Sequence, residues 1–469
     1  MSENLDQLEA NQVVLDTDTQ PSPGFTSKDY LKFIIPSLIG VLFFLTPIMV
    51  DGKVTIGMGV LADFVKGLIK DQLPLITVIL LSTSAIVSLY FKLIQTKQEN
   101  KDNMLLAIFQ VNGIWLSLRI LGALFVVMTW MQVGPEWIWN RNTGGVVLHD
   151  LAPALITFFF FASLLLPLLV DFGLMEFIGT MVRNVFRTIF RLPGRSSIDA
   201  VASWIGSGTV GVLITTQQYE GGFYSKREAS VISTNFSIAS IAFSLVVASF
   251  IGIDHLFIEF YASVIVAGVI AAIITPRLPP LCWKKDEYLE GVGKQIKEDV
   301  PSNTSLFQWG VQQAVLRAQK APSFGQLTKI GLCNVVDIWF GLLPLVMAIG
   351  TIAMALTEYT PVFTWLSAPL VPLLELLQLP EAAKAAPAML VGFADMFLPA
   401  VVGKGIESEL TRFVIAGVSM TQLIYMSEVG VLLLKSKIPL NLIELFAIFV
   451  LRTLITLPII ALFAHWLVF

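Results

Sequence analysis

The chain alternates long apolar runs with short polar segments over almost its whole length. An α-helix needs about 20 apolar residues to cross the hydrocarbon core of a bilayer, and many of these runs reach that length. The pattern predicts nine membrane-spanning helices, at residues 29–50, 72–96, 106–132, 147–172, 227–252, 256–275, 329–357, 411–434 and 440–467. The predicted fold class is therefore an all-α polytopic membrane protein.

Two further apolar stretches, at residues 197–220 and 383–405, are interrupted by Gly or Pro near their centres. In lipid, an interrupted helix is tolerated only where it is buried in protein or lines a cavity. We therefore interpret each stretch as a re-entrant helical hairpin, which enters the membrane and returns to the same side. A pair of such segments at matching places in two halves of a chain indicates the substrate site of a transporter.

The basic residues indicate the orientation, because cytoplasmic loops are enriched in Lys and Arg. With the N-terminus inside, the basic clusters at 183–195 and 435–437 are cytoplasmic, and the predicted outer segment 133–150 holds a single Arg. The outer segment 51–71, with three Lys, is the exception. Counting either hairpin as a full crossing would invert every later loop. We expect a protein of an inner (plasma) membrane with a disordered cytoplasmic tail, residues 1–28.

The two hairpin regions align in one register, with an offset of 186 residues (392 − 206 = 186). This register places Gly206 on Gly392, Lys226 on Arg412, and Ser233 on Ser419. Because one hairpin begins at the inner face and the other at the outer face, the halves form an inverted repeat, as in many secondary transporters. The predicted regions are the tail 1–28, scaffold helices 29–146, a first repeat 147–275, a cytoplasmic linker 276–328 and a second repeat 329–469.

The composition agrees with a membrane protein and argues against other classes. Of the 469 residues, 55% are hydrophobic and 14% are charged, and the net charge of -4 gives no basic signature for nucleic acid. Cys282 and Cys333 fit no metal or redox spacing, and the three histidines are not paired at metal-ligand spacing. The sequence shows no glycine-rich phosphate loop. We expect no catalytic residue, no metal site and no cofactor, apart from Na⁺ or H⁺ as a coupling ion.

Two stretches carry a resemblance to a known family. The first, from Ser203, reads SWIGSGTVGVLITTQQYEGGFYSKREASVISTNFSIASIAFS, and the second, from Gly392, reads GFADMFLPAVVGKGIESELTRFVIAGVSMTQLIYMSEVG. With the order of elements, they resemble the nucleoside-recognition Gate domain, and more narrowly YjiH-type bacterial membrane proteins, over residues 29–469. The segment after the first hairpin is also similar to that of concentrative nucleoside transporters. The resemblance implies the fold of a solute transporter.

The hairpin tips depart from the pattern of the concentrative nucleoside transporters. Those proteins carry Gln-Thr-Glu at the tip of the first hairpin, whereas this chain has Ser207, Gly208 and Thr209 there. The acid of this chain lies instead on the second hairpin, as Asp395. The departure concerns the identity of the solute and leaves the implied fold unchanged.

In the first half, the polar residues at the hairpin tip and on the next helix are candidates for substrate binding. The hydroxyls of Ser207 and Thr209 lie beside backbone groups that a broken helix leaves unpaired, and they suit a polar solute or Na⁺. Asn235 is costly to bury without partners, because its amide must satisfy donors and an acceptor. In the resemblance, the helix with Asn235, Ser237 and Ser240 contacts the solute. The alternative is that these small polar residues serve only close helix packing and interhelical hydrogen bonds.

In the second half, the candidates are Asp395, Thr421, Gln422 and Glu428. A carboxylate at bilayer depth costs on the order of 3 kcal/mol and usually pairs or marks an ion pathway. The alternative for Glu428 is that it lies near the inner boundary and reaches water. Because we find no Lys or Arg to match these acids in the second-half core, they favour a neutral or cationic solute.

The predicted function is secondary-active transport of a small polar solute by alternating access, coupled to Na⁺ or H⁺, with nucleosides and amine-like compounds as candidates. The expected partners are the lipid bilayer and the solute; a homo-oligomer is compatible with the sequence, and nucleic acid is not expected. We do not expect an enzyme, because the spans show no His, Cys or paired-carboxylate constellation. An envelope scaffold and an intramembrane enzyme with a Gate-type fold remain the alternatives.

Overall fold

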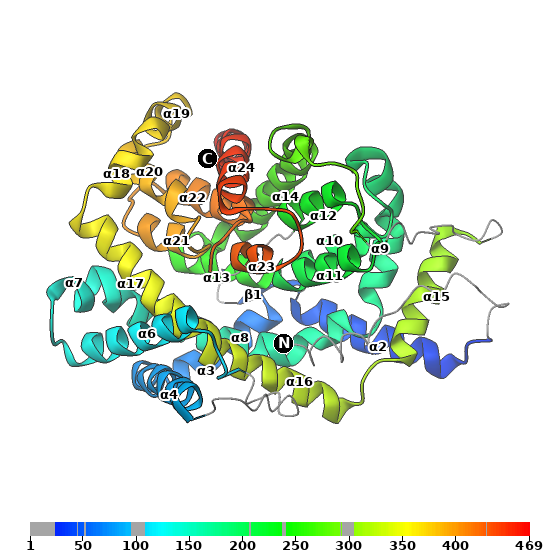
Figure 1. The fold of residues 1–469 in the computed structure, drawn as a ribbon, viewed down its shortest axis with the longest axis horizontal. Coiled ribbons are helices and arrows are strands. Elements are labelled where there is room, and N and C mark those ends of the chain that lie inside the picture. The colour runs from blue at the N-terminus through cyan, green and yellow to red at the C-terminus, as the bar shows by residue number, and fades with distance from the viewer. Residues whose placement is uncertain are drawn as a thin grey trace. The chain divides into compact units, whose positions relative to one another are not determined.

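The computed structural model describes residues 24–44, 46–50, 53–94, 108–205, 208–236, 241–290, 292, 304–427 and 429–469. Most of this part of the chain is helical (Figure 1). Its strands form a two-stranded antiparallel ribbon, β1 (Pro47–Val50) and β2 (Lys53–Ile56). Within the described ranges, six helices are long and apolar enough to cross a membrane: Leu73–Leu93, Gly113–Met131, Glu136–Val170, Asp254–Arg277, Phe324–Tyr359 and Leu442–Val468. The protein is therefore an all-α, multi-pass membrane protein.

The chain folds into two compact units, each assembled from stretches that are separate in the sequence. The first unit contains Gly57–Pro167 and Pro322–Trp365. The second unit contains Leu15–Ile56, Leu168–Ala321 and Leu366–Phe469. Both predicted hairpin regions lie in the second unit.

The first unit is a bundle built around α6 (Gly113–Met131), which packs against α4 (Leu73–Ile94) and α17 (Leu343–Tyr359). Gly122 permits the approach of α6 to α17, because a Cβ at this position would overlap the carbonyl of Pro344. The other helices of this unit are α3 (Gly57–Leu68), α7 (Glu136–Trp139), η1 (Arg141–Gly145), η2 (Val147–Leu151), most of α8 (Ala152–Val170), α16 (Phe324–Asp337) and η7 (Ile338–Leu342).

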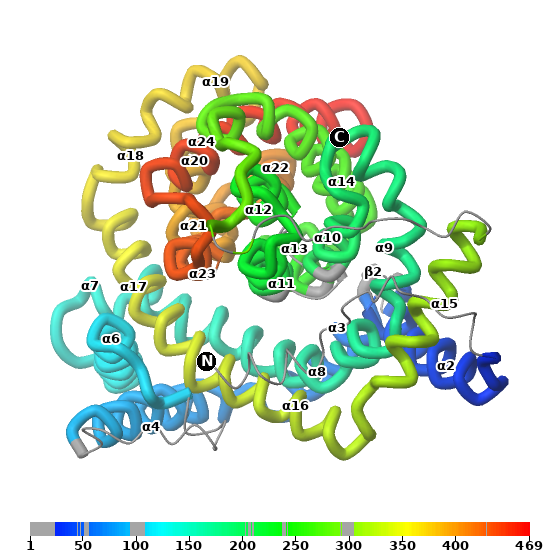
Figure 2. Tube along the Cα trace, turned by 45° about the vertical axis from the view of Figure 1, so that its right-hand side comes forward, coloured from blue at the N-terminus to red at the C-terminus, as the bar shows by residue number. Residues whose placement is uncertain are grey.

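The second unit contains two pairs of short helices at the places where the sequence predicts hairpins. In the first pair, α10 (Ser196–Ile205) packs against α11 (Gly208–Glu220), and in the second, α20 (Ala382–Val391) packs against α21 (Leu398–Gly403). Figure 2 shows all four helices in the second unit. Gly211 brings the arms of the first pair together, because a Cβ there would collide with the Ser203 hydroxyl.

Two of the predicted spans are interrupted in the second unit. The predicted spans at 227–252 and 411–434 are each divided, into α12 (Lys226–Asn235) and α13 (Ile241–Ile251), and into α22 (Glu409–Gln422) and α23 (Val429–Lys435). After α22 the chain leaves the helix at Leu423, whose φ is 64°, a left-handed conformation that ends the hydrogen-bond ladder.

The N-termini of both broken helices are capped. The Ser225 side chain accepts a hydrogen bond from the Glu228 backbone N–H in a capping box, and the Ser408 side chain accepts one from the Thr411 backbone N–H. Two long helices, α14 (Phe257–Ile274) and α24 (Leu442–Phe463), pack against α22 (Figure 1). The apolar helices α14 and α24 therefore enclose α22, and α14 also contacts α12.

The remaining described helices connect these elements. They are α2 (Ser27–Phe44), α9 (Leu174–Val185), η3 (Phe186–Phe190), η4 (Asp254–Leu256), η5 (Thr275–Arg277), η6 (Leu281–Trp283), α15 (Leu306–Gln319), α18 (Val362–Ser367), η8 (Ala368–Leu370), α19 (Val371–Leu376) and η9 (Ala464–Val468). The first predicted span, 29–50, ends six residues early because Pro47 begins the strand β1; proline disfavours helix in the residue before it and lacks an N–H.

The segment after Pro276, which the sequence presents as a linker, is tied to the helices of the second unit. The backbone N–H of Lys226 donates to the Glu287 carbonyl at 2.8 Å, and the Lys284 ammonium lies 2.7 Å from Glu444, at the start of α24. These contacts fix the N-terminal end of α12 relative to α24.

Candidate functional site

A fully buried arginine joins the ends of the two broken helices. Arg452 lies near the middle of α24 with 0% of its surface exposed. Its Nε donates to the backbone carbonyl of Thr421 at 2.8 Å, in the last turn of α22. Its Nη1 donates to Oδ1 of Asn235, the last residue of α12, also at 2.8 Å. We call Asn235, Thr421 and Arg452 the Arg452 cluster.

Asn235 is fully engaged within the protein. Its Nδ2 donates to the Val231 carbonyl and to Oγ1 of Thr234, both at 3.1 Å, and its Oδ1 accepts from Arg452. Both amide hydrogens are therefore used, and the remaining capacity of this side chain is that of an acceptor. The sequence assigns Asn235 to the solute, whereas the structure places it as the partner of a guanidinium.

Gln422 links α22 to the second hairpin and to α24. Its Nε2 donates to the carbonyl of Met389 at 2.7 Å and to Oγ1 of Thr453 at 2.9 Å. Its Oε1 has no hydrogen-bond partner, and a Cβ on Gly392 would collide with it. Gly392 therefore permits the end of α20 to reach the end of α22.

Asp395 lies in the turn between α20 and α21, and only 8% of its surface is exposed. Its Oδ1 accepts from the backbone N–H of Phe397 at 2.8 Å. The backbone of the same turn pairs with the chain after the break in α22: the N–H of Met426 donates to the Phe393 carbonyl at 2.8 Å, and that of Ser427 to the Ala394 carbonyl at 3.0 Å. The second hairpin and the second broken helix thus meet at Asp395.

The structure brings Asn235 and Thr421 together through Arg452, and it places Gln422 and Asp395 at the contact between α22 and the second hairpin. The side chains of the other candidates are not among those that the structure describes. Ser207, Ser237, Ser240 and Glu428 fall outside the described residues, and Thr209 lies in the first turn of α11 with its side chain outside the described part.

The first hairpin holds a buried acid that the sequence analysis did not select. Asp199, on α10, accepts at Oδ2 from the Tyr224 hydroxyl at 2.9 Å and from Oγ1 of Thr215, on α11, at 3.3 Å. The signal was present in the sequence, because Asp199 is an acid within an apolar hairpin arm.

The expectation that the second-half core holds no Lys or Arg is wrong. Arg452 lies in that core, in the middle of the predicted span 440–467. A lone arginine at the centre of an apolar span is a functional signal in its own right, and its burial removes the main reason for preferring a neutral or cationic solute.

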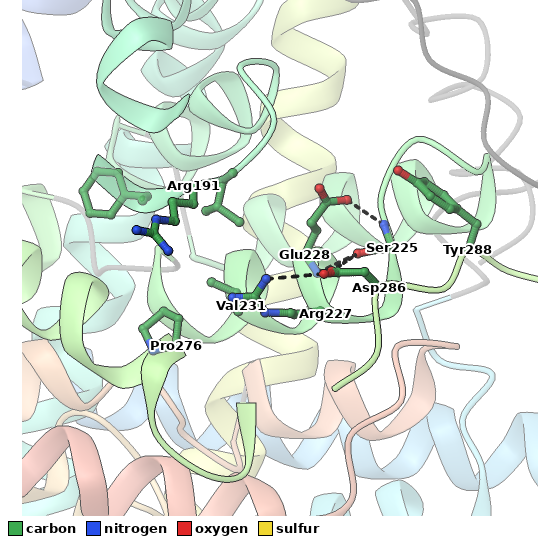
Figure 3. Close-up of a pocket in the computed structure, with 10 residues that line it drawn as sticks. Arg191, Ser225, Arg227, Glu228, Val231, Pro276, Asp286 and Tyr288 are labelled. Carbon is green, nitrogen blue, oxygen red and sulfur yellow. Dashed lines mark hydrogen bonds and ion pairs between the residues drawn. The ribbon is translucent and has the colours of Figure 1, made fainter. Parts of the chain in front are cut away.

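A cavity of about 290 Å³ opens beside the first turns of α12 (Figure 3). Arg191 lies on one side of it, and Asp286 lies on the other, where it accepts from Ser225 Oγ at 3.2 Å and pairs with Arg227 Nη1 at 3.5 Å. Val231, whose carbonyl accepts from Asn235, also lines the cavity. One helical turn therefore separates this cavity from the Arg452 cluster.

Comparison with known proteins adds a family to this geometry. Residues 152–254 match the family model Gate, described as nucleoside recognition. An uncharacterized protein of Alkalihalophilus pseudofirmus is 58% identical over 459 residues, covering 98% of this chain and 99% of that protein. The chain belongs to one family with that protein, and its residues 152–254 form a Gate domain. No solved structure matches the chain.

The Gate segment covers only part of the site. It runs from α8 through the first hairpin and α12 to the end of α13, so it includes Asp199 and Asn235. The second hairpin, α22 and Arg452 lie beyond it. The Gate match therefore supports the first half of the site, and the second half depends on the contacts described above.

Proposed function

We propose that the protein is a secondary-active transporter of a small polar solute. The observation that carries the proposal is the Arg452 cluster, in which the ends of two broken helices meet at one enclosed polar point of the second unit. Broken helices are tolerated at membrane depth only where protein or a cavity satisfies them, and in transporters their ends form the substrate and ion sites. The match of residues 152–254 to a family model described as nucleoside recognition supports a solute-binding role.

The proposed topology has nine crossings and two re-entrant hairpins in an inverted repeat, with the N-terminus in the cytoplasm of the bacterial cell and the protein in its inner membrane. The distribution of Lys and Arg between loops supports this arrangement. Substrate would reach the site from either face by alternating access, and movement of the solute would be coupled to Na⁺ or H⁺.

The solute that suits this site presents both donors and acceptors. Arg452 offers N–H groups, whereas Asp395 and the Oε1 of Gln422 offer acceptors. Nucleosides fit this description and agree with the family. With Arg452 in the core, amine-like solutes lose the preference that the acids alone would give them.

The proposal is tested first by binding and then by transport. The purified protein is heated in the presence of single nucleosides, amines and amino acids, because a ligand that binds only the folded state raises the melting temperature. A compound that does so is then offered to proteoliposomes with an imposed Na⁺ or H⁺ gradient. Concentrative uptake supports the proposal; binding without uptake under any gradient or in counterflow contradicts it.

Asp395→Asn is the informative variant in that assay. The substitution keeps the acceptor that faces the Phe397 N–H and removes the charge, so the protein should insert and purify normally but lose concentrative uptake. Glu136→Gln, an exposed acid of the first unit, is the matched control and should transport normally. Wild-type accumulation by the Asp395→Asn protein would show that this carboxylate does not couple transport to an ion.

A further inference from the structure

Among the described residues, the guanidinium of Arg452 is enclosed without a carboxylate partner. None of the ion pairs in the described part of the chain includes it. Two of its nitrogens donate to uncharged oxygens, and Nη2 has no hydrogen-bond partner within the same residues. A charge taken out of water is strongly unfavourable unless other groups compensate it. In the part of the chain that the structure describes, that compensation comes from groups other than an acid.

The C-terminal ends of two helices supply it. Each helix end leaves backbone carbonyls without intrahelical partners and carries a partial negative charge. Arg452 binds one such carbonyl, that of Thr421 in the last turn of α22, and binds the side chain of Asn235, the terminal residue of α12. The Tyr425 hydroxyl donates to another carbonyl near the end of α22, that of Ser419, at 2.7 Å. A backbone carbonyl at the end of α22 and the side-chain oxygen of the last residue of α12 thus meet at one cation.

In transporters with broken helices, unwound carbonyls and the C-terminal ends of half-helices are the groups that coordinate Na⁺. We propose that Arg452 is a resident cation, which takes the position between the ends of α12 and α22 that a Na⁺ ion would otherwise fill. The wild-type protein then binds no Na⁺ at this position. One consequence rests on the proposed transport function: a coupling ion must bind elsewhere in the chain.

The test uses Na⁺ itself as the probe. The melting temperature of the purified protein is measured in NaCl and in choline chloride at equal ionic strength. We expect Asn235→Ala to leave any saturable dependence of the wild type on Na⁺ unchanged, because a coupling Na⁺ would bind elsewhere in the chain. Arg452→Gln leaves the Thr421 carbonyl and the Asn235 amide oxygen without the cation, so we expect a lower melting temperature in choline and a saturable recovery as Na⁺ is added. Arg452→Lys, which keeps a charge, should fall between the two and respond less to Na⁺.

Arg452→Ala adds a second probe, because it leaves space for a free guanidinium ion. Guanidinium chloride at low millimolar concentration, far below its denaturing range, should restore the melting temperature of this variant. Arg412→Gln is the matched control. Arg412 donates to a single helix-end carbonyl, that of Ile251 at 3.0 Å, and one carbonyl cannot hold a Na⁺ ion, so neither probe should restore this variant.

Two results would overturn the proposal. The first is a saturable Na⁺ stabilisation of the wild type that is lost in Asn235→Ala, since the ion would then share the position assigned to Arg452. The second is an Arg452→Gln protein with no added response to Na⁺. If Gln and Ala variants do not fold, Arg452→Lys decides: it must fold and be less stable in choline than in Na⁺. A protein that shows these responses but no uptake refutes the transport function and leaves the resident cation standing.

Discussion

Two arginines lie buried in apolar helices, one in each unit, and their charges are compensated in different ways. Arg119, in α6 of the first unit, donates through Nη1 to Ser88 Oγ at 2.8 Å and has an acid nearby. A Cβ on Gly341 would lie 3.1 Å from Oδ1 of Asp337 and 3.6 Å from Nη2 of Arg119. Arg452, in the second unit, has helix ends in place of an acid. An acid can compensate an arginine in a bundle whose helices stay packed. Helix ends can do so only where a helix is interrupted.

The difference bears on function because a carboxylate partner and helix-end partners respond differently when the helices change their geometry. Asp337 stays close to Arg119 as long as the helices that carry them remain packed. The contacts of Arg452 depend on the geometry of the breaks in α12 and α22, which any rearrangement of those breaks would alter. The first unit therefore has the character of a scaffold, and the second unit holds the element that we expect to respond to a ligand.

Removal of Arg452 should have the largest effect on stability. Arg452→Met keeps the bulk of the side chain but leaves the Thr421 carbonyl and the Asn235 Oδ1 enclosed without donors. Each such group costs about 1–3 kcal/mol, so the free energy of unfolding in detergent should fall by about 2–6 kcal/mol. The measurement is denaturant unfolding followed by the helical circular dichroism signal. A loss well below this range would show that the helix ends do not depend on the guanidinium.

The corresponding change in the first unit should cost less. Arg119→Met removes one printed side-chain hydrogen bond, to the Ser88 hydroxyl, which can turn to another partner. Because one group loses its donor where Arg452→Met deprives two, we expect a smaller fall, of about 1–2 kcal/mol, in the same unfolding assay. A cost equal to that of Arg452→Met would remove the distinction between the two arginines.

Double-mutant cycles that pair each arginine with one acid should give the smallest energies and the clearest contrast between the two units. Arg119→Met combined with Asp337→Asn should show a coupling of about 0.5–1 kcal/mol, because the two side chains compensate each other. Arg452→Met combined with Asp395→Asn should be additive, since no ion pair joins them among the described residues. Unfolding free energies of the four single and two double variants, each against wild type, decide the matter. Coupling in the second pair alone would mean that Asp395 is the hidden counter-ion of Arg452.

The sequence was sufficient to predict where the second unit departs from plain membrane helices. Interrupted stretches at 197–220 and 383–405 contain the helix pairs α10–α11 and α20–α21. The polar residues Asn235 and Thr421, aligned in the internal repeat, do meet through a shared partner. Pattern alone was enough here because Gly and polar residues at membrane depth need enclosed partners, and few places in a fold provide them.

The partner itself could not be predicted from local pattern. Arg452 lies 217 residues from Asn235 in the chain, and its span has no Gly or Pro beside it to mark a break. Its role depends on which helix ends face it, a property of tertiary packing. The end of α22 was likewise not predicted, because apolar residues follow it and Leu423 ends the helix by its backbone conformation.

The central claim, an inverted repeat with broken helices inside, is tested most directly by the side from which each hairpin is reached. In a background without Cys282 and Cys333, Glu220→Cys marks the end of α11, and Gly405→Cys, where a side chain would meet open space, marks the end of the second hairpin. With a membrane-impermeant maleimide on intact cells, we expect Gly405→Cys to be labelled at once and Glu220→Cys to be labelled only after the membrane is permeabilised. Labelling of both from the same side would contradict the inverted repeat, and with it the proposed transport site.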